Sequence, residues 1–216
     1  MTIFKQKYLI SDRALSPVWV FVIYCFLAFC VYFPALFNGF MSDDFTWLDM
    51  LTSGPGPDLN FGDRFFLPLS HYIQYVLLFA TNGNPLLLHI FQLLIHMINA
   101  FLLFRILKQF MHRQNENFHW FAFAGGLLFL ICPYNTEAVN WFAAISYPLS
   151  VLFFLLSVLA GLKAIESGRN KNIFSYALLY LLSLLCKEIT ISAFLIPVAA
   201  LVFGLIPKSK QTYKLI

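Results

Sequence analysis

The stretch PVWVFVIYCFLAFCVYFPALF, residues 17–37, runs directly into NGFMSDDFTWLDM, residues 38–50. The first part is an apolar run of the length that an α-helix needs to cross a membrane. The second part places two adjacent carboxylates, Asp43 and Asp44, where the chain leaves that run. A chain that alternates such runs with short polar connections is predicted to be an all-α polytopic membrane protein.

The composition of the whole chain supports this prediction. Of its 216 residues, 60% are hydrophobic and 11% are charged, whereas soluble domains carry roughly a quarter charged residues. The formal net charge of +4 does not indicate nucleic-acid binding, because the basic residues follow a membrane topology. The four cysteines lie in or beside apolar segments without metal-ligand spacing, so we interpret them as small buried residues.

Apolar runs separated by short connections define the expected spans. We predict about six transmembrane helices, of which the third and fifth are short, at 17–37, 85–105, 119–133, 148–165, 173–187 and 189–206. A further apolar stretch, 65–80, is interrupted by proline and polar side chains. We interpret it as an interfacial or re-entrant helix within the first outer loop.

The basic residues predict the orientation of these helices. Every Lys and Arg except Arg64 and Lys187 falls in a tail or connection that six spans place on one side. By the positive-inside rule this is the cytoplasmic side, and it holds both termini. The acidic residues expected on the opposite side are Asp43, Asp44, Asp49, Asp58, Asp63, Glu137 and Glu188. We expect an integral protein of a bacterial plasma membrane, or of the endoplasmic reticulum membrane if the source is eukaryotic.

The pair Asp43–Asp44 is the first candidate for chemistry at the outer surface. Two carboxylates this close do not both ionise cheaply unless a cation or hydrogen-bond donors compensate them. One carboxylate could accept a proton from a hydroxyl nucleophile while the other binds a divalent metal or positions the acceptor. A solvated start of a loop explains the same pair without any function, and the sequence leaves both interpretations open.

Two other outer segments carry charges beside apolar runs. CPYNTEAVNW, residues 132–141, contains Glu137, which could face the aspartate pair or simply favour the start of a short helix. LLCKEITIS, residues 184–192, contains Lys187 and Glu188. Ionisable residues so close to hydrocarbon are costly and often functional. Lys187 could extend to the membrane interface or hold a lipid phosphate.

The second predicted span carries a polar stripe, His89, Gln92, His96 and Asn99, on one face of the helix. A polar stripe in a membrane helix should face protein rather than lipid. We favour hydrogen bonding between helices over ligand contact for His96 and Asn99. His89 lies near the outer end of the span, where it could reach a site.

These motifs together resemble a known family. FNGFMSDDFTWL at 37–48 is similar to the first-loop motif of the GT-C superfamily of membrane glycosyltransferases, nearest to TMTC-type protein O-mannosyltransferases and their bacterial relatives. The family's following segments are matched in order by FFLPLSHYIQYVLLFATNGNPLLLHIFQLLIHMINAFLLF at 65–104, PYNTEAVNW at 133–141 and LLCKE at 184–188. Cys132, Ile145, Tyr147 and Leu67 depart from the family pattern, which has His, Arg, Asp and Arg there.

The resemblance implies transfer of a sugar from a polyprenyl-phosphate donor to a hydroxyl acceptor at the extracytoplasmic face. It implies catalytic roles for Asp43, Asp44 and Glu137, with Asp44 as a candidate ligand of Mg²⁺ or Mn²⁺. The residues that would bind substrate or phosphate are Arg64, His71, His89, Lys187 and Glu188. The expected partners are membrane lipid, the lipid-linked sugar, a hydroxyl acceptor and a partner membrane chain, and no nucleic acid.

Members of the family continue through further spans, so residues 1–216 resemble a single N-terminal GT-C-like module. Two other functions stay open for such a module. It could be a non-catalytic or partner-dependent membrane unit, or a flippase or transporter of lipid-linked sugars. A transporter predicts polar residues deep in several helices, whereas the clear polar stripe of this sequence lies on one span.

Overall fold

The computed structural model describes residues 16–53, 66–112 and 119–194, which form helices without a strand. The all-α class predicted from the sequence is therefore confirmed for these residues. The elements in chain order are α1 (Pro17–Tyr32), η1 (Phe33–Phe37), α2 (Asp43–Ser53), α3 (Pro68–Ala80), α4 (Pro85–His112), α5 (His119–Ile131), η3 (Pro133–Asn135), α6 (Thr136–Asn140), η4 (Phe142–Ile145), α7 (Ser146–Ser167), α8 (Asn170–Cys186) and η5 (Glu188–Phe194).

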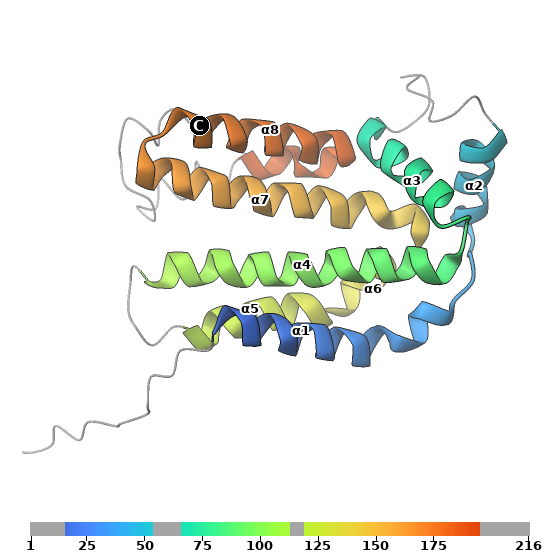
Figure 1. The fold of residues 1–216 in the computed structure, drawn as a ribbon, viewed down its shortest axis with the longest axis horizontal. Helices are drawn as coiled ribbons and strands as arrows, with labels where there is room; N and C mark the ends of the chain where they lie inside the picture. Colours follow the sequence, from blue (N-terminus) through green and yellow to red (C-terminus); the bar gives the residue numbers. More distant parts are fainter. Residues whose placement is uncertain (1–15, 54–65, 113–118, 195–216) are drawn as a thin grey trace, which may run out of the picture.

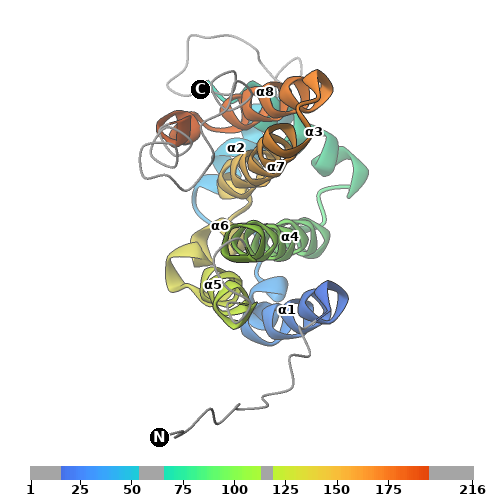
Figure 2. The same cartoon turned by 90° about the vertical axis from the view of Figure 1, so that its left-hand side faces the viewer.

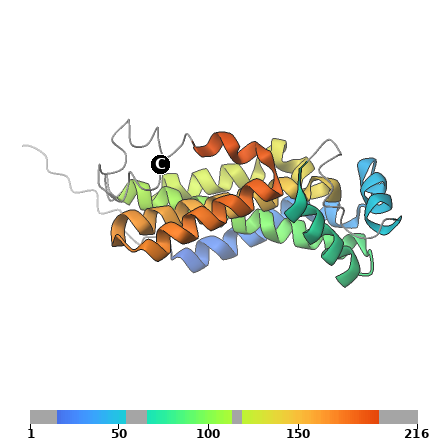
Figure 3. The same ribbon diagram turned by 90° about the horizontal axis from the view of Figure 1, so that it is seen from above.

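The long helices form an elongated bundle around α4. End-on, α4 lies between the pair α1 and α5 on one side and the pair α7 and α8 on the other (Figure 2). The shorter helices α2 and α3 lie together at one end of this bundle (Figures 1 and 3). The connections that contain α6 and η4 reach the same end (Figure 1). Helices that run up and down in this way bring segments distant in sequence to one end.

Three helical segments are long and apolar enough to cross a membrane, Pro17–Phe37, Pro85–Phe110 and Phe142–Ser167. The segments His119–Ile131 and Pro133–Asn140 pass the same test as a pair, bent by 48°. Pro133 explains the bend, because proline removes a backbone donor and clashes with the preceding turn. A membrane protein with three or four such spans is thus supported by the described residues.

The predicted span boundaries can be compared with these helices. The spans 17–37, 85–105 and 148–165 each lie within a membrane-length helix. The short third span is part of the bent pair, and the short fifth span corresponds to α8, which has 17 residues. The sixth, 189–206, begins in η5 and continues outside the described residues. A total of six spans therefore stays a prediction.

The two ends of the bundle carry opposite charges. Asp43, Asp44 and Glu137 lie on α2 and α6, at the end that also holds α3. At the other end, Arg169 lies in the turn between α7 and α8, and Lys171 lies in the first turn of α8. This separation agrees with the charge pattern of the sequence, although the side of the membrane that each end faces stays a prediction.

A close helix crossing holds α1 against α4 and α5. The hydroxyl of Tyr24 on α1 donates to the carbonyl oxygen of Phe123 on α5 at 2.6 Å. A Cβ atom at Gly126 would collide with the Tyr24 side chain and with the backbone carbonyl of Ala100 on α4. The absence of a side chain at Gly126 thus allows the three helices to pack closely.

Candidate functional site

The aspartate pair lies at a tight turn that begins α2. Ser42 has φ of 44°, a left-handed conformation that non-glycine residues seldom adopt. The backbone N–H of Met41 donates to Oδ2 of Asp44 at 2.9 Å, and the N–H of Asp44 donates to the carbonyl of Met41 at 2.8 Å. The Asp44 side chain thus holds the turn closed, and Asp43 at the first position of α2 is left exposed.

Asp44 also ties α2 to the segment before α7. Its Oδ1 accepts a hydrogen bond from the backbone N–H of Ala143 in η4 at 2.7 Å, and the residue is fully buried. Backbone N–H donors on both oxygens replace the water that a buried carboxylate loses. Asp44 therefore joins the start of α2, which carries Asp43, to η4. Each of its two carboxylate oxygens accepts a hydrogen bond from a backbone N–H.

The polar stripe of α4 faces protein, as the sequence predicted. His89, Gln92, His96 and Asn99 are each at most 2% exposed. Nε2 of Gln92 donates to the carbonyl of Ala138 at 3.2 Å, and Nε2 of His96 lies 2.9 Å from the carbonyl of Leu130. These carbonyls lie at the breaks around α6, where a helix leaves them without intrahelical partners. The stripe thus supports the irregular backbone at this end of the bundle.

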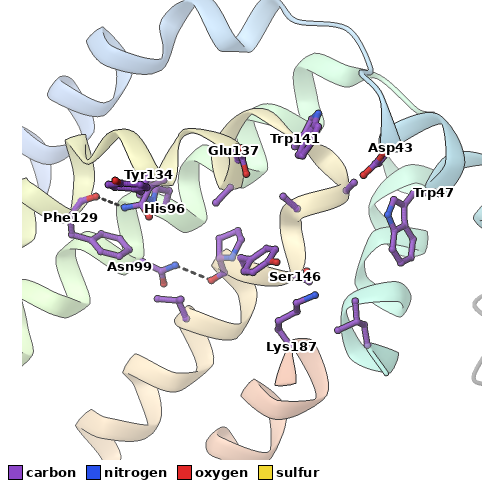
Figure 4. A pocket seen from close by; sticks show the side chains of 18 residues that line it. Asp43, Trp47, His96, Asn99, Phe129, Tyr134, Glu137, Trp141, Ser146 and Lys187 are labelled. Carbon is purple, nitrogen blue, oxygen red and sulfur yellow. Dashed lines mark hydrogen bonds between the residues drawn. The ribbon is translucent and has the colours of Figure 1, made fainter. Parts of the chain in front are cut away.

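A second break positions Lys187. The helix α8 ends at Cys186, and Lys187 adopts an extended conformation. The hydroxyl of Ser70 on α3 donates to the carbonyl of Cys186 at 2.8 Å, and the hydroxyl of Thr190 donates to the carbonyl of Lys187 at 3.2 Å. Hydroxyl groups therefore satisfy the carbonyls exposed by the break. The break turns the Lys187 side chain away from the axis of α8 and toward α7 (Figure 4).

The Lys187 ammonium lies near an aromatic ring and a carboxylate. Its side chain is 11% exposed, and Nζ lies 4.9 Å from the centre of the Tyr147 ring, which is a cation–π distance. Nζ also lies 4.0 Å from Oε1 of Glu188, whose side chain is 59% exposed. Such a half-solvated pair at this distance contributes little to stability. The ammonium thus lies close to both an aromatic ring and a solvent-exposed carboxylate.

These segments enclose a cavity of about 490 Å³. Asp43, Glu137 and Lys187, three of the residues predicted from sequence, line it together (Figure 4). They come from α2, from α6 and from the break after α8, so the fold brings three distant motifs to one place. The other lining residues are Trp47, Leu67, His96, Asn99, Phe129, Tyr134, Asn135, Ala138, Trp141, Ala143, Ala144, Ser146, Tyr147, Pro148 and Val151.

The remaining candidates lie beside the cavity or outside the described residues. The His71 ring packs against Trp47, with ring centres 4.6 Å apart, and burial together with the Lys187 charge lowers the pKa of His71. His89 is fully buried beneath the turn of Asp44. Arg64 lies outside the described residues. The site therefore has one buried cation at its wall, Lys187, and two exposed carboxylates.

The cavity does not provide a protein-held metal site within the described residues. No group of three His, Cys, Asp or Glu side chains that could hold a metal ion occurs in them. The oxygens of Asp44, the predicted metal ligand, accept backbone N–H groups instead. Mg²⁺ in proteins is usually bound by one or two carboxylates together with substrate phosphates, so the expected Mg²⁺ or Mn²⁺ stays a prediction.

Sequence reasoning missed the aromatic wall of the cavity. Trp47, Tyr134, Trp141 and Tyr147 line it, and the first three stand within the motifs quoted from the sequence. The signal was hidden because aromatic residues make up 19% of the chain. Tyr147 is notable because the resembled family has a charged residue there, whereas here its ring meets the Lys187 ammonium.

Comparisons of this chain with models of known protein families, with curated proteins and with solved structures find no match.

Proposed function

We propose that this chain is a membrane glycosyltransferase module that transfers a sugar from a polyprenyl-phosphate donor to a hydroxyl acceptor. The observation that carries the proposal is the cavity in which Asp43, Glu137 and Lys187 meet. One cation and two carboxylates beside apolar helices are what a lipid-linked phosphate donor and a hydroxyl acceptor require. The resemblance of the motifs to GT-C glycosyltransferases supports the same reaction.

In this reaction the acceptor oxygen attacks the anomeric carbon of the donor, and the bond between that carbon and the phosphate oxygen breaks. Asp43 takes the proton of the acceptor hydroxyl as general base, a role open to it because its carboxylate is exposed at the cavity. Asp44 is the positioning residue, because it closes the turn that presents Asp43. Glu137, which also lines the cavity, orients the acceptor hydroxyl.

Lys187 binds the phosphate that leaves. The phosphate gains negative charge as the bond to the sugar breaks, and a nearby ammonium stabilises that charge. A lysine that is only 9% exposed acts in a low-dielectric surrounding, where such a contact is stronger than in water. The apolar helices around the cavity would hold the polyprenyl chain within the bilayer.

Transfer from polyprenyl-phosphate donors by the full chain in lipid tests the proposal, with matched variants of two aspartates on α2. Asp43→Asn should lower the transfer rate at least about 100-fold, the usual contribution of a general base. Asp49→Asn should keep the wild-type rate within about twofold, because Asp49 is exposed, accepts a bond from Ser53 and does not line the cavity. A panel of donors that bear different sugars is needed, each with and without divalent metal.

Two results would contradict the proposal. Equal transfer rates of wild type and Asp43→Asn would show that Asp43 is not the general base. No donor consumption by folded wild-type protein with any sugar of the panel would favour the non-catalytic module instead. A flippase would move the lipid-linked sugar across vesicles without consuming it.

A further inference from the structure

The cavity has two ends that differ in chemistry. Asp43 and Trp47 lie at one side of it, and His96, Asn99 and Phe129 lie at the opposite side (Figure 4). The proposed reaction uses the charged groups and assigns nothing to the second side, here named the neutral end and defined by those three residues. Its three side chains carry polar or aromatic groups without a carboxylate, Lys or Arg.

Asn99 at the neutral end holds an acceptor that has no donor. Its Nδ2 donates to the carbonyl oxygen of Pro148 at 2.9 Å. Because a carbonyl only accepts, this bond fixes which way the amide is oriented. Oδ1 is then buried without a hydrogen-bond partner among the described residues, and the residue is fully buried. A buried acceptor left in this state is destabilising, and a bound donor would remove that cost.

His96 adds a second acceptor to the same wall. Its Nε2 lies 2.9 Å from the carbonyl of Leu130, so Nε2 carries the proton and Nδ1 of the neutral ring is an acceptor. The Nε2–H of His96 and one N–H of Asn99 are therefore used on backbone carbonyls. What remains for a ligand is a pair of neutral acceptors next to the apolar ring of Phe129.

Uncharged hydrogen-bond acceptors favour a ligand that carries uncharged hydrogen-bond donors. An anion such as phosphate would face lone pairs there, and a compact cation would find no carboxylate among the three residues of the neutral end. Hydroxyl groups satisfy amide and imidazole acceptors, and the apolar face of a sugar ring can cover an aromatic ring. The cavity volume of about 490 Å³ lies within the range of small-ligand sites, about 300–1,000 Å³.

We propose that the neutral end binds the monosaccharide unit of the donor, and that Asn99 is the residue that recognises one of its hydroxyl groups. This inference rests on the proposed function, because it assigns the sugar of the same donor whose phosphate meets Lys187. A site built around a hydroxyl discriminates strongly against a ligand that lacks it, since its acceptor is then left unpaired.

Binding to carriers with and without a sugar tests the inference. The probes are a short-chain polyprenyl phosphate and the same carrier linked to mannose, glucose or N-acetylglucosamine. Quenching of tryptophan fluorescence reports binding, because Trp47 and Trp141 line the cavity. Wild type should bind at least one sugar-linked carrier about tenfold more tightly than the sugar-free carrier, and Asn99→Leu should abolish this preference while binding the sugar-free carrier within about twofold of wild type.

Gln92→Leu is the matched control. Gln92 lies on the same buried stripe and donates to the carbonyl of Ala138, and its Oε1 is also buried without a partner, yet it does not line the cavity. The control should keep the preference for the sugar-linked carrier. If Gln92→Leu and Asn99→Leu lose the preference alike, Asn99 acts only through the packing of α4 and the inference fails.

The remaining outcomes separate the inference from the proposed function. Equal affinity of wild type for all four carriers would overturn the sugar assignment and leave carrier binding intact. Absence of binding to every carrier by folded wild type would overturn the proposed function and, with it, this inference. Thermal unfolding of each variant establishes that the protein compared is folded.

Discussion

At the scale of single residues, adjacent aspartates have different surroundings. Asp44 is fully buried and accepts hydrogen bonds from the backbone N–H groups of Met41 and Ala143. Asp43, in contrast, is exposed at the cavity. The sequence made both aspartates catalytic candidates and Asp44 a candidate metal ligand, but it did not predict that one is buried and the other exposed. The difference in burial between the two aspartates depends on the left-handed conformation of Ser42, which residue propensities for helix or turn do not predict.

Asp44→Ala is expected to destabilise the protein by about 3 kcal/mol, because two buried amide groups lose a charged acceptor. It should also lower transfer, since the turn that presents Asp43 loses its tie to η4. Thermal or denaturant unfolding in detergent measures the loss. The control is Asp49→Ala, on the exposed face of the same helix, which should change the free energy of unfolding by less than about 0.5 kcal/mol. An equal loss of stability in both variants would contradict the role given to Asp44.

At the scale of elements, the polar stripe of α4 was predictable and its partners were not. The spacing from His89 to Asn99 placed four polar residues on one helix face, and all are buried. Their partners are carbonyls at helix breaks around Leu130, Ala138 and Pro148. Such short, broken elements have no periodicity of their own, so sequence patterns indicate the helix face but not what it supports.

The helix α3 was predicted from its proline and polar interruptions as an element outside the spans, and its His71 makes it sensitive to pH. Burial and the Lys187 charge lower the pKa of His71 below its ordinary value of 6.5. The folded protein thus holds His71 neutral where the unfolded chain binds a proton. Its contribution to stability is complete above about pH 6.5 and falls as the pH drops below that value.

His71→Gln should therefore lose less stability than wild type between pH 7.5 and pH 5. The midpoint of thermal unfolding at each pH measures this, and the difference between the two proteins isolates His71 from other titrating groups. A midpoint that falls equally in both proteins over this range would show that His71 does not carry the effect.

At the scale of the whole molecule, the up-and-down order of helices places three separate motifs at one end. Apolar run lengths predicted the long spans well, because crossing a membrane imposes a minimum length on a helix. They described the bent pair around Pro133 less well, since the bend divides one apolar run into two helices. The cavity itself was not predictable from sequence, because it depends on where α2, α6 and the end of α8 meet in space.

The central claim is that Asp43, on α2, and Lys187, after α8, act on one donor in one cavity. A double-mutant cycle on kcat/KM for transfer, using Asp43→Asn, Lys187→Met and the double variant, tests this most directly. We expect strong coupling, so that kcat/KM of the double variant is within about tenfold of that of the more damaged single variant. Losses that multiply as independent factors would show that the two residues do not work in the same site.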